Sequence, residues 1–268
     1  MASDSRLSPF GRVLRRWRSA RGMSQLALAT AAETSTRHLS FLETGRAQPS
    51  REMVLRLAHA LDVPLRERNA LLGAAGFAAL YRESGLDAPA MNAVARMIDF
   101  TLERFEPFPA FLEDRCFRVL RANRAALKTL GSFANAAPVW REQPPNLLRL
   151  TLHPDALRPH IVNFDEVAAA MLARLERAVA TSGGDPELEA LERELRALPG
   201  LPDSASLPVT IDPVLPLHLK RGELEVRVFT MLSQVGAAQD VTAAELHIET
   251  LMPADTASEA VLRALAEG

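Results

Sequence analysis

The chain has 268 residues, a hydrophobic fraction of 48% and a net charge of −2. This length exceeds what one typical domain needs, and the composition is ordinary for a globular protein, so two domains with sizeable cores are expected. The single cysteine, Cys116, excludes an internal disulfide and a zinc site made of cysteines, and it fits a reducing cytosol. No apolar run approaches the roughly 18 residues of a membrane span, and the N-terminus lacks the apolar core of a signal peptide, so a cytoplasmic protein without a membrane partner is expected.

Charge is divided unevenly along the chain. Residues 1–75 hold 12 arginines and 6 acidic residues, a net of +6, whereas residues 76–268 hold 19 basic and 27 acidic residues, a net of −8. A basic N-terminal part followed by an acidic remainder predicts that the N-terminal part alone binds a polyanion. The alternative explanation is chance composition over a short segment.

Residues 10–80 are predicted to form five short helices with breaks of a few residues. Ser24, Ser35 and Ser50 each precede a helical pattern, where a serine hydroxyl can accept a hydrogen bond from a backbone N–H of the first turn. Gly45 stands where a residue in the left-handed conformation is wanted to close the third helix. These start and stop signals predict a compact helical domain.

The rest of the chain mixes helical and strand patterns. PAFLEDR and FRVLRAN predict two short strands, PLHLK and ELEVRVFTML predict a hairpin that turns at Gly222, and AELHIETLM predicts a last strand. Helical spacing extends over residues 146–180 between them. The predicted organisation is an all-α domain at 1–80, a linker at 81–91 and an α+β domain at 92–268, which has an antiparallel sheet of about five strands with helices over one face.

The third predicted helix leaves polar and aromatic side chains on its outer face. By the 3.6-residue period, Leu39 and Leu42 point together into the core of the domain. A short helix that follows another across a tight turn has the geometry of a helix-turn-helix, whose second helix enters the major groove of DNA. The outward face carries residues able to donate, accept or make apolar contact in such a groove: Arg37, Ser40, Phe41 and Thr44.

The run from Gly11 to Gly45 resembles the helix-turn-helix of phage-repressor-like regulators, the XRE family. The resemblance rests on Ser24-Gln25, Leu28-Ala29, Ser35 and Leu42-Glu43-Thr44-Gly45. Three longer stretches carry a second resemblance: STRHLSFLETGRAQPSREMVLRLAHALDVPLRERNALLGAAGF, PFPAFLEDRCFRVLRANRAAL and NLLRLTLHPDALRPHIVNFDEVA. Through them nearly the whole chain looks like the MmyB-like branch, in which this domain precedes a PAS-like ligand-binding domain. One departure is Glu33, because the family usually has glycine in the turn before the recognition helix. A positive φ at this residue would cost about 1 kcal/mol.

The position of each residue in this motif implies a role in DNA binding. Gln25 and Arg46 are expected to contact phosphates, and the Gln25 amide could also reach a base. Arg37 is expected to contact guanine, which is worth roughly 1–3 kcal/mol of discrimination, and Phe41 to touch a thymine methyl. The alternatives are a solvated arginine and a phenylalanine packed within its own domain. The residues expected at base edges are Thr36, Arg37 and Ser40. Since one such helix reads only a few base pairs of double-stranded DNA, a homodimer is expected.

The resemblance implies that the second domain binds a fatty-acid-like ligand. The expected site is the space between the sheet and the helices, where small molecules bind in such folds. Asn123 is an expected polar anchor, or merely the cap of the following helix. Six apolar residues are expected to line the site and are equally explained as ordinary core: Leu148, Leu152, Phe164, Met171, Phe229 and Met231.

The sequence therefore predicts a sequence-specific DNA-binding transcriptional regulator whose second domain senses a small apolar ligand. The alternative is a DNA-binding regulator whose second domain serves only dimerisation or partner recruitment. The six histidines are scattered, and no Gly-rich phosphate loop, nucleophile elbow or His-Glu zinc motif occurs. Neither an enzyme nor a metal or other cofactor is expected.

Overall fold

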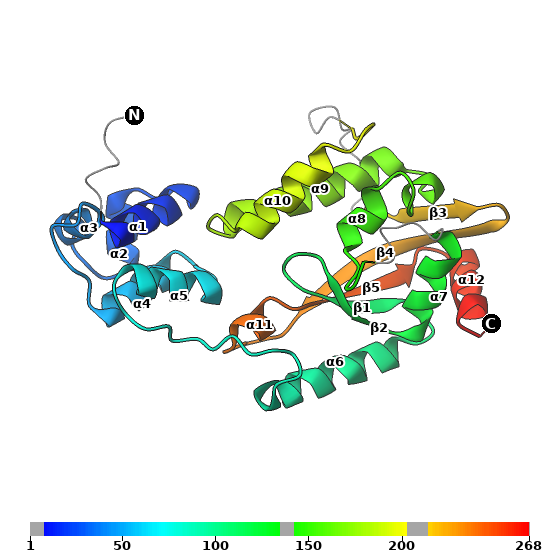
Figure 1. Ribbon diagram of the computed structural model, residues 1–268, viewed down its shortest axis with the longest axis horizontal. Coiled ribbons are helices and arrows are strands. Elements are labelled where there is room, and N and C mark those ends of the chain that lie inside the picture. Colours follow the sequence, from blue (N-terminus) through cyan, green and yellow to red (C-terminus); the bar gives the residue numbers. More distant parts are fainter. Residues whose placement is uncertain (1–7, 135–141, 203–213, 268) are drawn as a thin grey trace. The chain divides into compact units, whose positions relative to one another are not determined.

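The computed structural model describes residues 8–134, 142–202 and 214–267 (Figure 1). The chain divides into two compact units. The first comprises Met1–Glu83 together with Ala180–Gly184 and Gln239–Val241, and the second comprises the remaining residues. Within the described ranges, no helix combines the length and apolar character needed to cross a membrane.

The N-terminal unit is all-α, as predicted. Four of its helices begin at a serine: Ser8, Ser24, Ser35 and Ser50 each accept a hydrogen bond from a backbone N–H of the following turn at 3.0–3.2 Å. The three predicted serine caps are therefore confirmed. The helices are α1 (Pro9–Ala20), α2 (Gln25–Ala31), α3 (Thr36–Glu43), α4 (Arg51–Ala60) and α5 (Leu65–Ala74).

The core of this unit is built around α3. Leu39 and Leu42 are fully buried, and they belong to one apolar cluster with Leu28 of α2 and Leu57 of α4. Helix α1 approaches the end of α3 closely, because a Cβ added at Gly11 would lie 2.1 Å from the backbone oxygen of Glu43. The close approach of two backbones at Gly11 holds α3 in place.

The turns on either side of α3 require left-handed backbone conformations. Gly45 ends the helix with φ +75°, as predicted. Glu33 adopts φ +50° in the turn between α2 and α3. The turn therefore forms although Glu33 stands where glycine is usual. Its left-handed backbone conformation is unfavourable for a non-glycine residue.

The C-terminal unit is α+β. Its strands are β1 (Ala110–Glu113), β2 (Val119–Ala122), β3 (Leu217–Arg221), β4 (Leu224–Gln234) and β5 (His247–Pro253). Its α-helices are α6 (Asn92–Phe105), α7 (Arg124–Phe133), α8 (Leu147–Leu152), α9 (Phe164–Thr181), α10 (Pro186–Arg196), α11 (Val241–Ala244) and α12 (Thr256–Glu267). Two short 3₁₀ helices, η2 (Pro89–Met91) and η4 (Arg158–His160), complete the described elements.

The strands form one antiparallel sheet in the order β2-β1-β5-β4-β3. The predicted hairpin is present, with Gly222 at φ +60° between β3 and β4. Strand β5 is central, and its register places Phe111 opposite Glu249 and Leu112 opposite Ile248. The five-stranded antiparallel sheet and the α+β, PAS-like fold class are confirmed.

Helices cover both faces of the sheet, so the prediction of helices over one face was wrong. Phe111 and Leu251 belong to a large apolar cluster with α7, α8, α9 and α10. Leu112 and Ile248 instead belong to a separate apolar cluster with residues of α6 and α11. Figure 1 shows α6 on the opposite side of the sheet from α8 and α9. All four residues of β1 are buried, because neither face of this strand meets water.

Two further expectations differ from the structure. The predicted helical stretch at 146–180 is divided into α8, η4 and α9. Pro154 lies in the first break and Pro159 lies within the short η4, and neither residue can donate a helical backbone hydrogen bond. Helix α12 follows the strand predicted as the last element, and it packs beside α7 and against β4.

Candidate DNA-recognition helix and candidate ligand cavity

Helix α3 presents a mixed polar and aromatic surface. The Ser35 hydroxyl caps the helix by accepting from the backbone N–H of His38 at 3.1 Å. With Leu39 and Leu42 buried, the opposite side of the helix remains outside: Arg37 and Thr44 are exposed, and Thr36, Ser40 and Phe41 are half-buried. The predicted base-edge residues thus lie on one accessible side of one helix.

Phe41 brings two of the predicted DNA-binding arginines together. The guanidinium carbon of Arg37 lies 5.4 Å from the centre of the Phe41 ring, and that of Arg46 lies 6.0 Å from it. Both distances are within the range of a cation–π contact. Phe41 therefore does not belong to the buried core of its domain; its ring contacts Arg37 from the first turn of α3 and Arg46 from the segment that follows the helix.

Gln25 has an internal partner that sequence reasoning missed. The carboxylate of Glu43 is only 2% exposed, and it accepts from the Arg18 guanidinium at 2.6 Å and from the Gln25 amide at 2.8 Å. This buried network ties α1, α2 and α3 together. Because a glutamine amide has two N–H donors, Gln25 keeps one for the expected phosphate contact.

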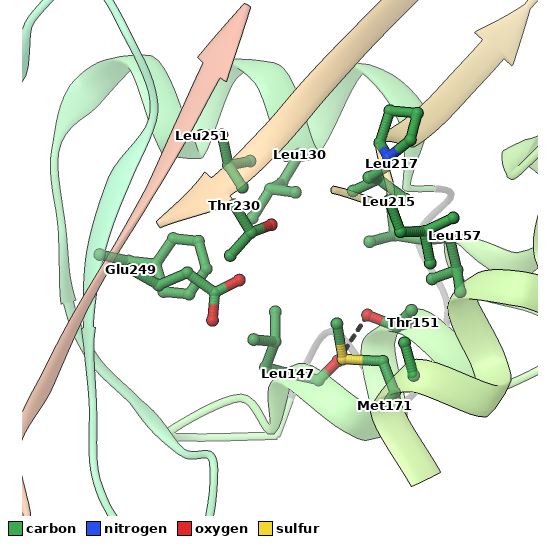
Figure 2. A pocket seen from close by; sticks show the side chains of 14 residues that line it. Leu130, Leu147, Thr151, Leu157, Met171, Leu215, Leu217, Thr230, Glu249 and Leu251 are labelled. Atoms are coloured by element: carbon green, nitrogen blue, oxygen red, sulfur yellow. Dashed lines mark hydrogen bonds between the residues drawn. The ribbon is translucent and has the colours of Figure 1, made fainter. Parts of the chain in front are cut away.

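The second candidate site is a cavity of about 160 Å³ between the sheet and the helices (Figure 2). Its walls come from β1, β3, β4 and β5, from α7, α8 and α9, and from the segments that lead into η4 and β3. Eleven of its fourteen lining residues are apolar. An engineered apolar cavity of about 150 Å³ stays dry and binds benzene, so a space of this size and lining suits a small apolar molecule.

The polar part of the cavity wall is acidic. Figure 2 shows the carboxylate of Glu249 pointing into the space, and Thr151 and Thr230 are the other polar residues among the fourteen. The Thr151 hydroxyl is already engaged, because it donates to the backbone oxygen of Leu147 at 2.9 Å. Glu249 is the strongest polar group that the cavity offers to a ligand.

Glu249 belongs to a buried cluster with Arg174 and Glu113. Arg174 donates to Glu249 at 3.0 Å and also to Glu113, and its guanidinium carbon lies 4.9 Å from the centre of the Phe117 ring. Burial, and then the charge of Glu249, raises the pKa of Glu113 to about 8, against the lowering effect of Arg174. Burial likewise raises the pKa of Glu249. The sequence analysis missed this cluster, although Arg174 lies on the same helical stripe as Met171.

Of the seven residues predicted to hold a ligand, Met171 lines this cavity and the other six do not. Leu148 and Leu152 are fully buried in the core, and Phe164 packs against that core under the guanidinium of Arg158. Phe229 is half-buried on β4, and Met231 is 49% exposed. Two residues on β4 thus lie away from the cavity, because the strand's register turns Thr230 rather than its neighbours inward.

Asn123 is a structural cap. Its side-chain oxygen accepts from the backbone N–H groups of Ala126 and Ala110, at 2.9 and 3.0 Å, and its amide donates to the backbone oxygens of Phe108 and Leu102. The side chain is buried and fully occupied by these bonds, so the second interpretation of the sequence, a helix cap, describes it. Across the described part of the chain, no group of three or more His, Cys, Asp or Glu side chains could hold a metal ion.

A helix-turn-helix with Arg37 on its second helix and Arg46 just after it, joined to an α+β unit with an apolar cavity, defines a class of protein, the DNA-binding regulators that carry a ligand-binding domain. Two family models match the chain in this order: a helix-turn-helix domain over residues 9–71, and the MmyB-like transcription regulator ligand binding domain over residues 94–265. The chain belongs to the MmyB-like transcription regulators. It is a DNA-binding helix-turn-helix regulator with an MmyB-like ligand-binding domain.

Two solved structures are similar to this chain. The restriction-modification controller protein C.AhdI from Aeromonas hydrophila is 36% identical, with 23% of this chain and 92% of that protein covered at a TM-score of 0.22. An RNA-binding light-oxygen-voltage receptor is 14% identical, with 97% of this chain and 62% of that protein covered at a TM-score of 0.25. A comparison with curated proteins gave no match. The family assignment rests on the two family models.

Proposed function

We propose that α3 reads DNA bases in the major groove and that the C-terminal unit adjusts this binding when a small apolar molecule occupies its cavity. The observation that supports base reading is the accessible side of α3, where Arg37 and Arg46 flank Phe41. In this proposal Arg37, Thr36 and Ser40 meet base edges, whereas Arg46 and Gln25 meet phosphates. The chain acts in the cytoplasm as a binding protein rather than as an enzyme.

Selection from a random pool of duplex DNA with the full-length protein tests the base-reading role. Arg37→Ala should relax the preferred site, whereas Arg46→Ala should weaken binding about equally across sequences. Arg96→Ala, which removes an exposed arginine of α6, is the matched control for loss of one charge. An unchanged preferred site for Arg37→Ala would remove this residue from the base-reading set.

We further propose that the protein binds a near-palindromic operator as a homodimer, because one recognition helix covers only a few base pairs. The division of labour follows the predicted boundaries, with DNA binding in residues 1–80, a linker at 81–91 and ligand binding in 92–268. Sedimentation of the protein with and without operator DNA tests the dimer. A monomer under both conditions would contradict it.

The ligand-sensing role is supported by the apolar cavity of about 160 Å³. Its walls suit the hydrocarbon part of the fatty-acid-like ligand that the sequence resemblance implies. Met171→Trp should fill the space and abolish any ligand-dependent change in operator affinity, while Leu127→Trp, at an exposed position of α7, should preserve it. If native protein carries no small molecule and neither variant alters the operator response, the alternative role in dimerisation or partner recruitment is favoured.

A further inference from the structure

The apolar cavity has one strongly polar point, and that point is a carboxylate. Glu249 is 3% exposed, and Figure 2 shows its carboxylate directed into the space that the apolar side chains enclose. A buried carboxylate is costly unless it is paired or hydrogen-bonded. Its presence in the wall therefore constrains the ligand more than the surrounding leucines do.

The position of Glu249 is fixed by the fold. Strand β5 is the central strand, and its register places Glu249 opposite Phe111 on the face that meets α8 and α9. Arg174 of α9 holds the carboxylate at 3.0 Å from the helix side. The carboxylate is thus held between a strand and a helix and cannot turn outward to water.

The charge around Glu249 is not balanced by its protein partners. Among the described residues, Arg174 is the one cation within ion-pair distance of either Glu249 or Glu113. Two carboxylates share this single guanidinium, which leaves one negative charge in excess when all three groups are ionised. Below the pKa of Glu113, about 8, the proton on Glu113 makes the cluster neutral, and a cationic ligand beside Glu249 would take over this role from the proton.

Arg174 is poorly placed to receive an anionic ligand. Its guanidinium is engaged by both carboxylates and lies over the ring of Phe117, and the residue does not line the cavity. A ligand carboxylate in the cavity would meet the carboxylate of Glu249 first, and like charges in a buried site repel strongly. A hydrogen-bond donor at the same place would instead satisfy Glu249.

We propose that the cavity takes a small apolar molecule whose polar end is a hydrogen-bond donor, above all a protonated amine, which donates to Glu249. This inference rests on the proposed ligand-sensing function and specifies the class of ligand. The apolar walls hold a single ring or a short chain, since a cavity of about 150 Å³ holds benzene. The ligand differs from a fatty acid at its head group.

Four molecules of one shape test the head group: benzylamine, benzyl alcohol, toluene and benzoate. Binding of each to the full-length protein is measured by titration calorimetry at neutral pH. Benzylamine should bind about tenfold or more tightly than toluene, because one charge-assisted hydrogen bond separates them, and benzyl alcohol should fall between the two. Benzoate should bind more weakly than toluene.

A variant assigns the preference to Glu249. Glu249→Gln should reduce the ratio of benzylamine to toluene affinity by about tenfold while leaving toluene binding in place. Glu103→Gln, which neutralises an exposed carboxylate of α6, is the matched control and should keep the ratio. Circular dichroism of each variant reports whether it is folded.

The outcomes separate the two proposals. Benzoate that binds as tightly as benzylamine would overturn the inference about the head group and leave ligand sensing standing. A folded Glu249→Gln variant with an unchanged ratio would overturn it as well. If none of the four molecules binds the wild-type protein, the inference about the head group is overturned, whereas the ligand-sensing function is judged separately by the Met171→Trp test. If the Glu249→Gln variant does not fold, the order of the four affinities for the wild-type protein still tests the inference about the head group.

Discussion

Replacing Glu43 by glutamine removes a buried negative charge from the helix-turn-helix unit and keeps the shape of the side chain. Glu43 is 2% exposed and accepts hydrogen bonds from Arg18 and Gln25 at 2.6 and 2.8 Å. The Arg18 side chain that would lose its charge partner is itself only 14% exposed. We expect this single substitution to destabilise the unit strongly.

The expected loss of stability depends on the environment in which Glu43→Gln leaves the unpaired charge of Arg18. Breaking a buried ion pair by removing one partner costs about 3–5 kcal/mol, whereas an exposed pair is worth about 0–1 kcal/mol. Arg18 keeps a hydrogen bond to the backbone oxygen of Met23 at 2.8 Å, and it retains some contact with water. A loss near the lower end of the buried range, about 3 kcal/mol, is therefore expected.

Urea unfolding followed by tryptophan fluorescence measures this loss. The chain has two tryptophans, and Trp17 is buried in the core of the N-terminal unit. In a Trp140→Phe background, the fluorescence of Trp17 reports the unfolding of that unit alone. Glu52→Gln, at an exposed carboxylate of α4, is the control and should change the free energy of unfolding by less than about 0.5 kcal/mol.

A double-mutant cycle with Arg18→Met separates the ion pair from other effects of the substitution. The combined variant should lose less than the sum of the two single variants, because neither charge is then left buried alone. If Glu43→Gln costs less than about 1 kcal/mol, or if the two losses simply add, Glu43 behaves like a surface residue and the reasoning from burial is refuted.

Three further outcomes follow from other residues. Gly11→Ala should cost about 1–3 kcal/mol in the same urea assay, because the new methyl group meets the backbone oxygen of Glu43. Burial raises the pKa of Glu113 to about 8, above the ordinary 4.5, so its contribution is complete below about pH 4.5 and is lost as the pH rises toward 8. The stability of the C-terminal unit should fall over that window by up to about 1.4 kcal/mol per pH unit, and Glu113→Gln should flatten the slope. Burial raises the pKa of the Cys116 thiol to about 12, so a thiol reagent at neutral pH should react slowly until urea unfolds the protein.

The helices of the N-terminal unit could be predicted from sequence because their signals are local. The serines that cap α2, α3 and α4 act on backbone groups within the same turn, so neighbouring letters reveal them. The positive φ at Glu33 could be predicted in the same way, from its place in the turn before the recognition helix. The Arg18–Glu43 pair escaped prediction, since 25 residues separate its partners and only packing joins them.

The sheet was predicted strand by strand, but the covering of its faces was not. Alternation along a strand indicates which residues share a face, and it does not say what lies on either face. Leu112 and Ile248 are buried by α6, a helix that precedes the sheet in the chain and gives no sign of its position. Helix α12 was missed because the sequence analysis assigned no element after the predicted last strand, AELHIETLM.

The cavity could be predicted least. Phe229 and Met231 are as apolar as the residues that line it, and only the register of β4 against β5 decides that Thr230 points inward instead. From sequence alone, Glu249 is typical of a polar residue on the solvent-facing side of a strand. Only the register of the sheet shows that it faces the cavity. One signal was available, because Arg174 lies on the apolar stripe of α9 with Val167 and Met171, where a charge requires a buried partner.

The central position of β5 has a consequence for how the protein is made. Ala110 of β1 pairs with Thr250 of β5, 140 residues later, so the sheet cannot be completed until nearly the whole chain has left the ribosome. Contacts between residues so distant in sequence slow folding, whereas the short helices of the N-terminal unit form through neighbouring residues. The N-terminal unit can therefore fold during synthesis, before its C-terminal partner is complete. Until β5 arrives, the facing edges of β1 and β4 stay unpaired, and the nascent chain is most prone to aggregate in that interval.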